Sequence, residues 1–427
     1  MIKYSNKMEN LKIKLVSLLR SSEKYTKTDM VYLTKNSFWL TGGQIISSAV
    51  SFGMAIAFAN LVDQKTYGIY KYIFSLVAIF SSFSLTGIGT ALLQSIATGF
   101  DKTLKLAFKK TLIWSFPMIL LTISGAIYYF LQDNFGIAIS LIIIATLQPF
   151  IKSFELYGAF LKGKKDFSKG ALFGAITDVI TSAFILTTIF FTNNVVLMIL
   201  SFFTSSFLIN GLFYKHILKK INTVSGIDTE SISYSKHLSL INILSNISSQ
   251  IDKVIIFHFL GAAQVAVYTF ATAAPKQIRG FLSIASTIAL PKLATKPAKE
   301  MLVSVRNSFW VSLSILIPIV TIYILAAPYL FKIFFPQYME AVNYSRIYIL
   351  FLLLMGNMSE LGLTALKAIK QKYIINISSS ILNIILMLVL SYFYGIWGII
   401  FSILITKLAT AIISYVLLIK LKTQNEQ

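Results

Sequence analysis

The stretch VVLMILSFFTSSFLINGLFY, residues 195–214, decides the fold of this chain. It carries no charge and is long enough to cross a bilayer as a helix, which takes about 20 mostly apolar residues. In lipid every backbone polar group must be paired, so such spans are helical. We therefore predict an all-α polytopic membrane protein with twelve transmembrane helices, near residues 38–60, 71–92, 110–131, 136–160, 170–192, 195–214, 237–259, 265–290, 307–330, 342–366, 372–392 and 395–419.

The basic residues predict which ends of the helices face the cytoplasm. They concentrate in the first tail and in every second loop after it, whereas the opposite loops and helix ends hold only Lys65, Lys71, Lys332 and Arg346. Because lysine and arginine are retained on the cytoplasmic side, both termini are predicted to be cytoplasmic. This distribution accounts for the net charge of +22 without a nucleic-acid partner.

Enzyme chemistry and cofactors leave no signal in the sequence. The chain has no cysteine and only three histidines, which are never paired at metal-ligand spacing. The motifs GxxxxGK(S/T), HExxH and GxSxG in a strand-to-helix context are also missing, so ATP is not expected to drive the protein directly. We predict a protein that is not an enzyme and has no cofactor or metal.

The chain divides into two similar halves. A short amphipathic segment is predicted within residues 1–36, followed by a six-helix bundle at 37–215, a polar connector at 216–236 and a second six-helix bundle at 237–420. TYGIY at 66–70 aligns with QVAVY at 264–268, and Trp114 aligns with Trp310. Internal repeats of this kind are typical of transporters that alternate access to a site between the two halves.

Several segments resemble a known family. They are LVDQKTYGIYKY (61–72), LTGIGTA (85–91), IDKVIIFHFLG (251–261), VYTFATA (267–273), FPQY (335–338) and GIWGI (395–399). Together they resemble the polysaccharide repeat-unit flippases of bacteria, which act in O-antigen or capsule synthesis and belong to the multidrug/oligosaccharidyl-lipid/polysaccharide (MOP) exporter superfamily. The resemblance implies two bundles around a central cavity in the bacterial inner membrane. It also implies a polyprenyl-diphosphate-linked oligosaccharide as substrate, with a polysaccharide polymerase and a chain-length regulator as partners.

Charged residues inside the spans indicate the candidate site. Each costs about 2.5–3.5 kcal/mol at the centre of a membrane helix, so these residues must pair or line a wet cavity. Lys276 and Arg279 lie three residues apart near mid-depth, and such cations suit an anionic diphosphate. The alternative is that they balance Asp252 and Glu360 as structural pairs. Lys253 and Lys407 add cations to the same half, although Asp252 and Lys253 are expected to point to different faces.

Carboxylates within the spans are candidates for ion coupling. Asp178 and Glu360 could exchange a proton or bind sodium during transport, or each could form an ordinary polar contact between helices. Lys152 and Glu155, three residues apart, are predicted to form an internal ion pair. Nothing in the sequence distinguishes a proton from sodium.

Two other functions are alternatives to that of a flippase. A drug or organic-cation exporter of the same superfamily would need an acidic cavity, whereas the second half of this chain carries an excess of cations. A membrane enzyme such as a polymerase or a sugar transferase would need a large loop with clustered arginine, histidine or aspartate, and no such loop is present. A flippase for lipid-linked oligosaccharides is the function that the sequence favours.

The predicted topology can be tested in intact cells, because the chain contains no cysteine. Single cysteines at Asn134 and Ser225 fall on opposite predicted sides, so a membrane-impermeant thiol reagent should label Asn134→Cys and leave Ser225→Cys unlabelled until the cells are broken. Labelling of Ser225→Cys but not of Asn134→Cys in intact cells would reverse the topology.

Overall fold

The computed structural model describes residues 30–221, 226–294, 298–354, 359–366 and 368–424. These residues form helices joined by short turns and contain no strand, so the predicted all-α class is confirmed. The amphipathic segment predicted within residues 1–36 lies almost entirely outside the described residues.

The described part of the first half contains nine helices, several of which are pairs that together cover one predicted span. They are α2 (Met30–Leu61), α3 (Gln64–Ser81), α4 (Ile88–Ala97), α5 (Thr103–Trp114), α6 (Phe116–Leu131), α7 (Phe135–Phe154), α8 (Leu156–Gly163), α9 (Phe167–Phe191) and α10 (Val195–Leu218). Side chains at the N-caps fix the starts of several helices. Asp63, for example, accepts a hydrogen bond from the backbone N of Thr66 at 2.8 Å and thereby starts α3 at residue 64.

The described part of the second half combines long helices with several short ones. They are α11 (Thr229–Leu260), α12 (Ala262–Ala294), α13 (Ala298–Phe334), the 3-10 turn η1 (Pro336–Tyr338), α14 (Ala341–Tyr348), α15 (Phe351–Leu354), α16 (Ser359–Ala365) and α17 (Ile369–Gln424). Within α17 the chain kinks at Gly395, where φ is 55° and ψ is −130°. This conformation suits glycine and joins two of the predicted spans.

Among the described residues, seven helical segments are long and apolar enough to cross a membrane by themselves. They are Thr41–Leu61, Thr103–Leu131, Phe135–Gly163, Phe167–Phe191, Val195–Leu218, Val305–Phe334 and Ile369–Leu421. The total of twelve therefore stays a prediction. The last segment contains two predicted spans, α3 and α4 are separated by a turn, and the polar residues of α11 lower its hydropathy.

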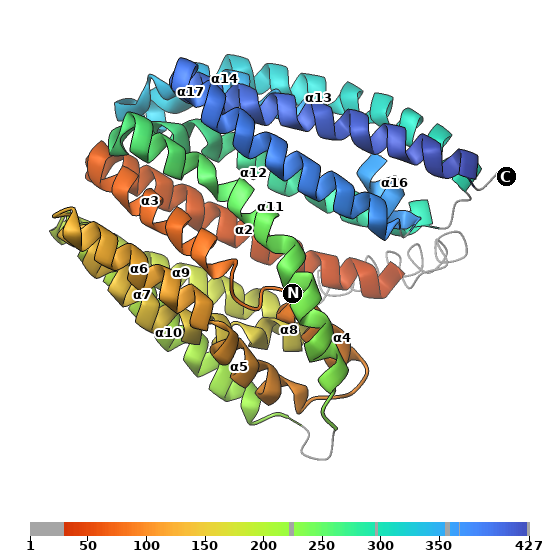
Figure 1. Ribbon diagram of the computed structural model, residues 1–427, viewed down its shortest axis with the longest axis horizontal. Coiled ribbons are helices and arrows are strands. Elements are labelled where there is room, and N and C mark those ends of the chain that lie inside the picture. Colours follow the sequence, from red (N-terminus) through yellow and green to blue (C-terminus); the bar gives the residue numbers. More distant parts are fainter. Residues whose placement is uncertain (1–29, 222–225, 295–297, 355–358, 367, 425–427) are drawn as a thin grey trace, which may run out of the picture.

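The helices form two groups that diverge from one end of the molecule (Figure 1). Helices α5 to α10 form one group, and helices α11 to α17 form the other. We call the end with the turns at 62–63, 132–134 and 192–194 the lysine-poor end, and the end with the turns at 98–102 and 164–166 the lysine-rich end. The groups lie close together at the lysine-poor end and apart at the lysine-rich end.

The connector between the halves is shorter than predicted. Helix α10 ends at Leu218 and α11 begins at Thr229, inside the predicted range of 216–236. Glu230 in the first turn of α11 favours this early start through the helix dipole. The first part of α11 packs on α4 of the first half. There, Ser239 of α11 accepts a hydrogen bond at 2.9 Å from the backbone N of Gly87, which directly precedes α4.

Close packing of α3 on α12 joins the halves at the lysine-poor end. Gly68 faces the start of α12 so closely that a Cβ at this position would lie 1.7 Å from the carbonyl oxygen of Ala262. No side chain larger than hydrogen fits there unless the helices separate. Glycine at position 68 is therefore required for this contact.

Polar contacts reinforce the same junction. The side-chain amide of Asn60 donates to the carbonyl of Phe334 at 3.1 Å, and that of Gln64 donates to the carbonyl of Gln337 at 2.6 Å. Phe334 is the last residue of α13, where backbone carbonyls lack partners within the helix, and Gln337 lies in η1, which follows it. Residues from the two halves thus satisfy each other's backbone at the lysine-poor end.

Replacing Gly68 tests whether this packing holds the lysine-poor end closed. Gly68→Val should push α3 away from α12, so that cysteines introduced at Gln64 and Gln337 react several-fold less with a short bifunctional thiol reagent. Gly53→Val is the matched control, because a Cβ at Gly53 would meet nothing within 4 Å. Unchanged cross-linking in a folded Gly68→Val protein would show that the contact does not hold this end closed.

Candidate functional site

Asp252 is the buried centre of a polar cluster where α11 and α12 pack against α3. It lies on α11, and its carboxylate accepts hydrogen bonds from the Tyr268 hydroxyl at 2.8 Å and from the backbone N of Lys253 at 2.8 Å. Its side chain is 4% exposed. A buried carboxylate is costly unless it is paired and hydrogen-bonded, and these contacts provide both conditions.

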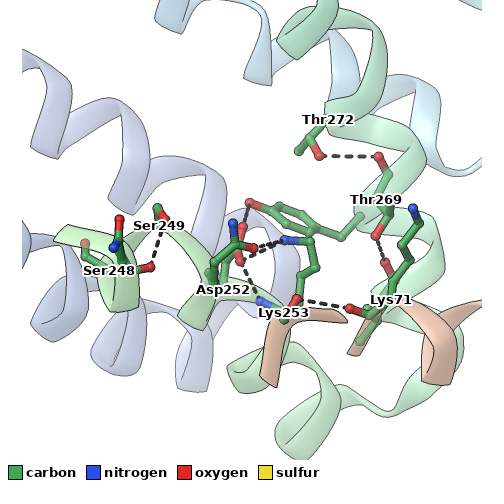
Figure 2. Close-up of polar contacts among 12 residues, drawn as sticks. Lys71, Ser248, Ser249, Asp252, Lys253, Thr269 and Thr272 are labelled. Carbon is green, nitrogen blue, oxygen red and sulfur yellow. Dashed lines mark hydrogen bonds and ion pairs between the residues drawn. The ribbon is translucent and has the colours of Figure 1, made fainter. Parts of the chain in front are cut away.

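Lys253 belongs to the same cluster, although its sequence position predicts a different face of the helix. Its side chain folds back, placing Nζ 3.4 Å from Oδ1 of Asp252 and 3.2 Å from Oε1 of Gln250 (Figure 2). The prediction that the two neighbours diverge is therefore wrong. The long lysine side chain spans the angular separation that the backbone imposes.

Lys71 joins the cluster from the other half of the chain and was not among the candidate residues. It lies on α3, in the region of α11 and α12 (Figure 2), with Nζ 5.3 Å from the centre of the Tyr67 ring and 5.6 Å from that of Tyr70. Lys253 and Lys276 are near enough to repel it. The N-cap at Asp63 is the sequence signal that would have placed Lys71 two turns inside a helix.

Lys276 lies on α12 close to the same tyrosines. Its Nζ is 5.7 Å from the centre of the Tyr268 ring and 5.9 Å from that of Tyr348, within the range of cation–π attraction. Asp252 attracts it and Arg279 repels it. Lys276 is exposed.

Arg279 and Lys407 extend the positive charge along the second group of helices. Arg279, on α12, is exposed and acts electrostatically on Lys407 of α17. Among the described residues, no carboxylate oxygen lies within 4 Å of Lys276, Arg279 or Lys407. We call Lys71, Lys253, Lys276, Arg279 and Lys407, together with Asp252, the cationic cluster.

The two carboxylates that are candidates for ion coupling are not members of the cationic cluster. Asp178 on α9 accepts a hydrogen bond from the Ser47 hydroxyl of α2. This is a polar contact between helices, the alternative to a role in ion coupling. Glu360 on α16 is exposed, and its charge attracts Lys407. The structure therefore places Glu360 at the edge of the cationic cluster and Asp178 in the first group of helices.

A cavity of about 610 Å³ lies next to the cluster. The predicted Lys152–Glu155 ion pair is confirmed, with a separation of 3.0 Å, and it lines this cavity. Gln148, Asn246, Ser249 and Gln250 also contribute to the wall. Within the described ranges, no three histidine, aspartate or glutamate side chains are placed to hold a metal ion.

Known structures with the same fold are transporters. The chain resembles a MOP superfamily transporter from Pyrococcus furiosus, described as having a binding pocket of reverse polarity, at 15% identity with a TM-score of 0.64 over 92% of this chain and 96% of that one. It resembles a multidrug resistance MATE family transporter of the same superfamily in an outward-facing conformation (15% identity, TM-score 0.64, 91% and 96% covered). An inward-facing structure matches at 14% identity and a TM-score of 0.56, over 88% and 95%.

Sequence comparison identifies the family. No curated protein matches the chain. A family model described as polysaccharide biosynthesis protein matches residues 33–295, which is more than half of the sequence. With the shared fold, this match indicates a membrane transporter rather than an enzyme. The chain belongs to the polysaccharide biosynthesis protein family and has the fold of the MOP superfamily transporters.

Proposed function

We propose that the protein is a flippase that moves polyprenyl-diphosphate-linked oligosaccharide repeat units from the cytoplasmic to the outer leaflet of the bacterial inner membrane, for O-antigen or capsule synthesis. In this proposal twelve transmembrane helices form two six-helix bundles, with both termini in the cytoplasm. The observation that carries the proposal is the cationic cluster, to which both halves of the chain contribute.

The charge of the cluster suits a diphosphate. Lys253 and Lys276 interact with the carboxylate of Asp252, whereas Lys71 and Arg279 interact with these cations, so positive charge is in excess where the dielectric constant is low. Lysine acts as a point charge toward phosphate, and arginine makes forked contacts. The tyrosine rings stabilise the ammonium groups from the side and leave N–H groups for an anionic ligand.

The conformation supports loading from the lysine-rich side. The halves contact each other at the lysine-poor end, through Gly68 and the carbonyl of Ala262, whereas the cavity is lined by residues farther along α3, α7 and α11. If the lysine-rich end faces the cytoplasm, this state accepts a substrate made there. Separation of α3 from α12 would then expose the site to the outside.

Transport against a gradient needs a coupling ion, for which we propose a proton or sodium. Asp178 has a hydroxyl partner but no cation within 4 Å among the described residues, so its charge is free to be neutralised by an ion. Glu360 is the second candidate, because ion binding there would change the attraction that it exerts on Lys407. A polysaccharide polymerase and a chain-length regulator would receive the exported units.

The alternative of a drug or organic-cation exporter shares the fold but not the charge. A cationic ligand would be repelled by Lys71, Lys253 and Lys276, and the single buried Asp252 is already bound to Tyr268 and Lys253. The electrostatics of the cluster therefore favour an anionic substrate.

Substitutions of Lys276 and Arg279 test the cationic site. Lys276→Ala and Arg279→Ala should each lower polysaccharide export about tenfold or more, because a charge-assisted hydrogen bond contributes about 1.5–3 kcal/mol. Arg279→Lys should restore only part of the activity, and Lys276→Glu should be worse than Lys276→Ala. Surface polysaccharide is measured in a strain that lacks the native copy, with protein level checked by immunoblot.

Lys332 provides the matched control for these variants. It is an exposed lysine in the last turn of α13, outside the cationic cluster. Lys332→Ala and Lys332→Glu should export normally. Normal export by the alanine and glutamate variants at both 276 and 279 would show that these two residues are structural.

Lys71 and Lys253 should differ in their effect on stability. Lys253→Gln removes the ion-pair partner of the buried Asp252, which costs about 3–5 kcal/mol, whereas Lys71→Gln removes no partner of a carboxylate. Both variants should lose export, but only Lys253→Gln should melt at a lower temperature. Adding Asp252→Asn to Lys253→Gln should recover the melting temperature and not the export. Recovery of export in that double variant would show that Lys253 acts only by neutralising Asp252.

A further inference from the structure

The cavity beside the cationic cluster differs from it in chemistry. Its walls come from α3, α4, α5, α7, α8 and α10 of the first half and from α11 of the second. None of the cationic-cluster residues lines it. The charged side chains in its wall are Lys152 and Glu155, which neutralise each other at 3.0 Å while both remain more than 40% exposed. The cavity is therefore polar but has no net charge.

Most of the polar residues in its wall carry a hydroxyl or an amide group. Serines and threonines from α3 to α5 and α10 contribute hydroxyls, and Gln148, Asn246 and Gln250 contribute amides. These groups donate and accept hydrogen bonds without carrying charge. Phe74, Phe202 and Phe203 add apolar faces. Neutral hydrogen-bonding groups beside aromatic rings suit a ligand that has both hydroxyl groups and C–H faces.

Gln148 shows that part of this wall is available to a ligand. The residue is 8% exposed, and its side-chain amide has no hydrogen-bond partner among the described residues. Its amide atoms are not among the enclosed polar atoms that lack a partner, so they are open to the cavity and can bond a ligand there. Its two donors and its acceptor can serve adjacent hydroxyls of the same molecule.

Gln250 connects the cavity to the cationic cluster. It lines the cavity, and its Oε1 accepts a hydrogen bond from Nζ of Lys253 at 3.2 Å. A ligand held by the cations at one end can therefore extend past Gln250 into the neutral cavity. The volume of about 610 Å³ lies in the range of sites for drug-sized molecules, and so fits a few sugar residues.

We propose that this cavity is a glycan subsite, which holds the uncharged sugars next to the diphosphate of the lipid-linked substrate. This inference rests on the proposed function. It adds two points, namely the position of the glycan and the absence of charge on its first sugars. Gln148 and Asn246 donate to and accept from sugar hydroxyl or acetamido groups, and the Lys152–Glu155 pair offers a donor and an acceptor of opposite charge.

The test uses two probes with the full-length protein in nanodiscs: undecaprenyl diphosphate, and undecaprenyl diphosphate carrying one N-acetylglucosamine. A cysteine at Ser249, an exposed residue in the cavity wall, is labelled with a maleimide in this cysteine-free chain. The sugar-bearing probe should slow the labelling about tenfold, and the bare diphosphate should leave it unchanged. Equal protection by both probes would overturn the glycan subsite.

Binding by variants separates the inference from the proposed function. Gln148→Ala should weaken the sugar-bearing probe about tenfold and leave the bare diphosphate unchanged, whereas Lys276→Ala should weaken both probes. Gln94→Ala, at an exposed glutamine of α4 outside the cavity, is the matched control and should bind both normally. If Gln148→Ala binds both probes like the unsubstituted protein, the subsite is wrong. If Lys276→Ala also binds normally, the proposed function is wrong.

Discussion

The close approach of α3 to α12 at Gly68 determines how the two halves of this protein meet. Because glycine has no side chain, the backbone of α3 reaches the carbonyl of Ala262, and the two helices pack tightly at the lysine-poor end. This contact brings Lys71, almost one turn farther along α3, to the region of Lys253 and Lys276. The halves separate toward the other end, and the cavity lies in the space between them.

The excess of positive charge at this junction costs free energy that the protein only partly offsets. Asp252 balances one cation, and the tyrosine rings near Lys71 and Lys276 provide weak attraction, about 0.5–2 kcal/mol for each contact. The remaining repulsion would be relieved by a bound anion. Each half contributes lysines to this site. Their repulsion opposes the approach of the two halves when the site is empty, and a bound anion removes it, so substrate binding favours their approach.

Apolar runs and turn residues predicted most of the helices, because membrane helices must satisfy their own backbone. Which polar residues meet at the candidate site depends on tertiary packing, which the sequence pattern does not show. The apolar pattern predicts a span that begins at residue 71, which places Lys71 at a helix end. The helix begins earlier, at the cap that Asp63 provides. Gln148 carried no signal, because a neutral residue within an apolar helix becomes informative only when a cavity is seen beside it.

The account is tested most directly by measuring flipping with the purified protein. Proteoliposomes containing a lipid-linked oligosaccharide are treated with an external glycosidase, which cleaves only the glycans that face outward. We expect the cleaved fraction to rise from about half to nearly all when the protein is present under an ion gradient, and to stay at half with Lys276→Glu. Export of an organic cation by the same vesicles, with no change in cleavage, would contradict the account.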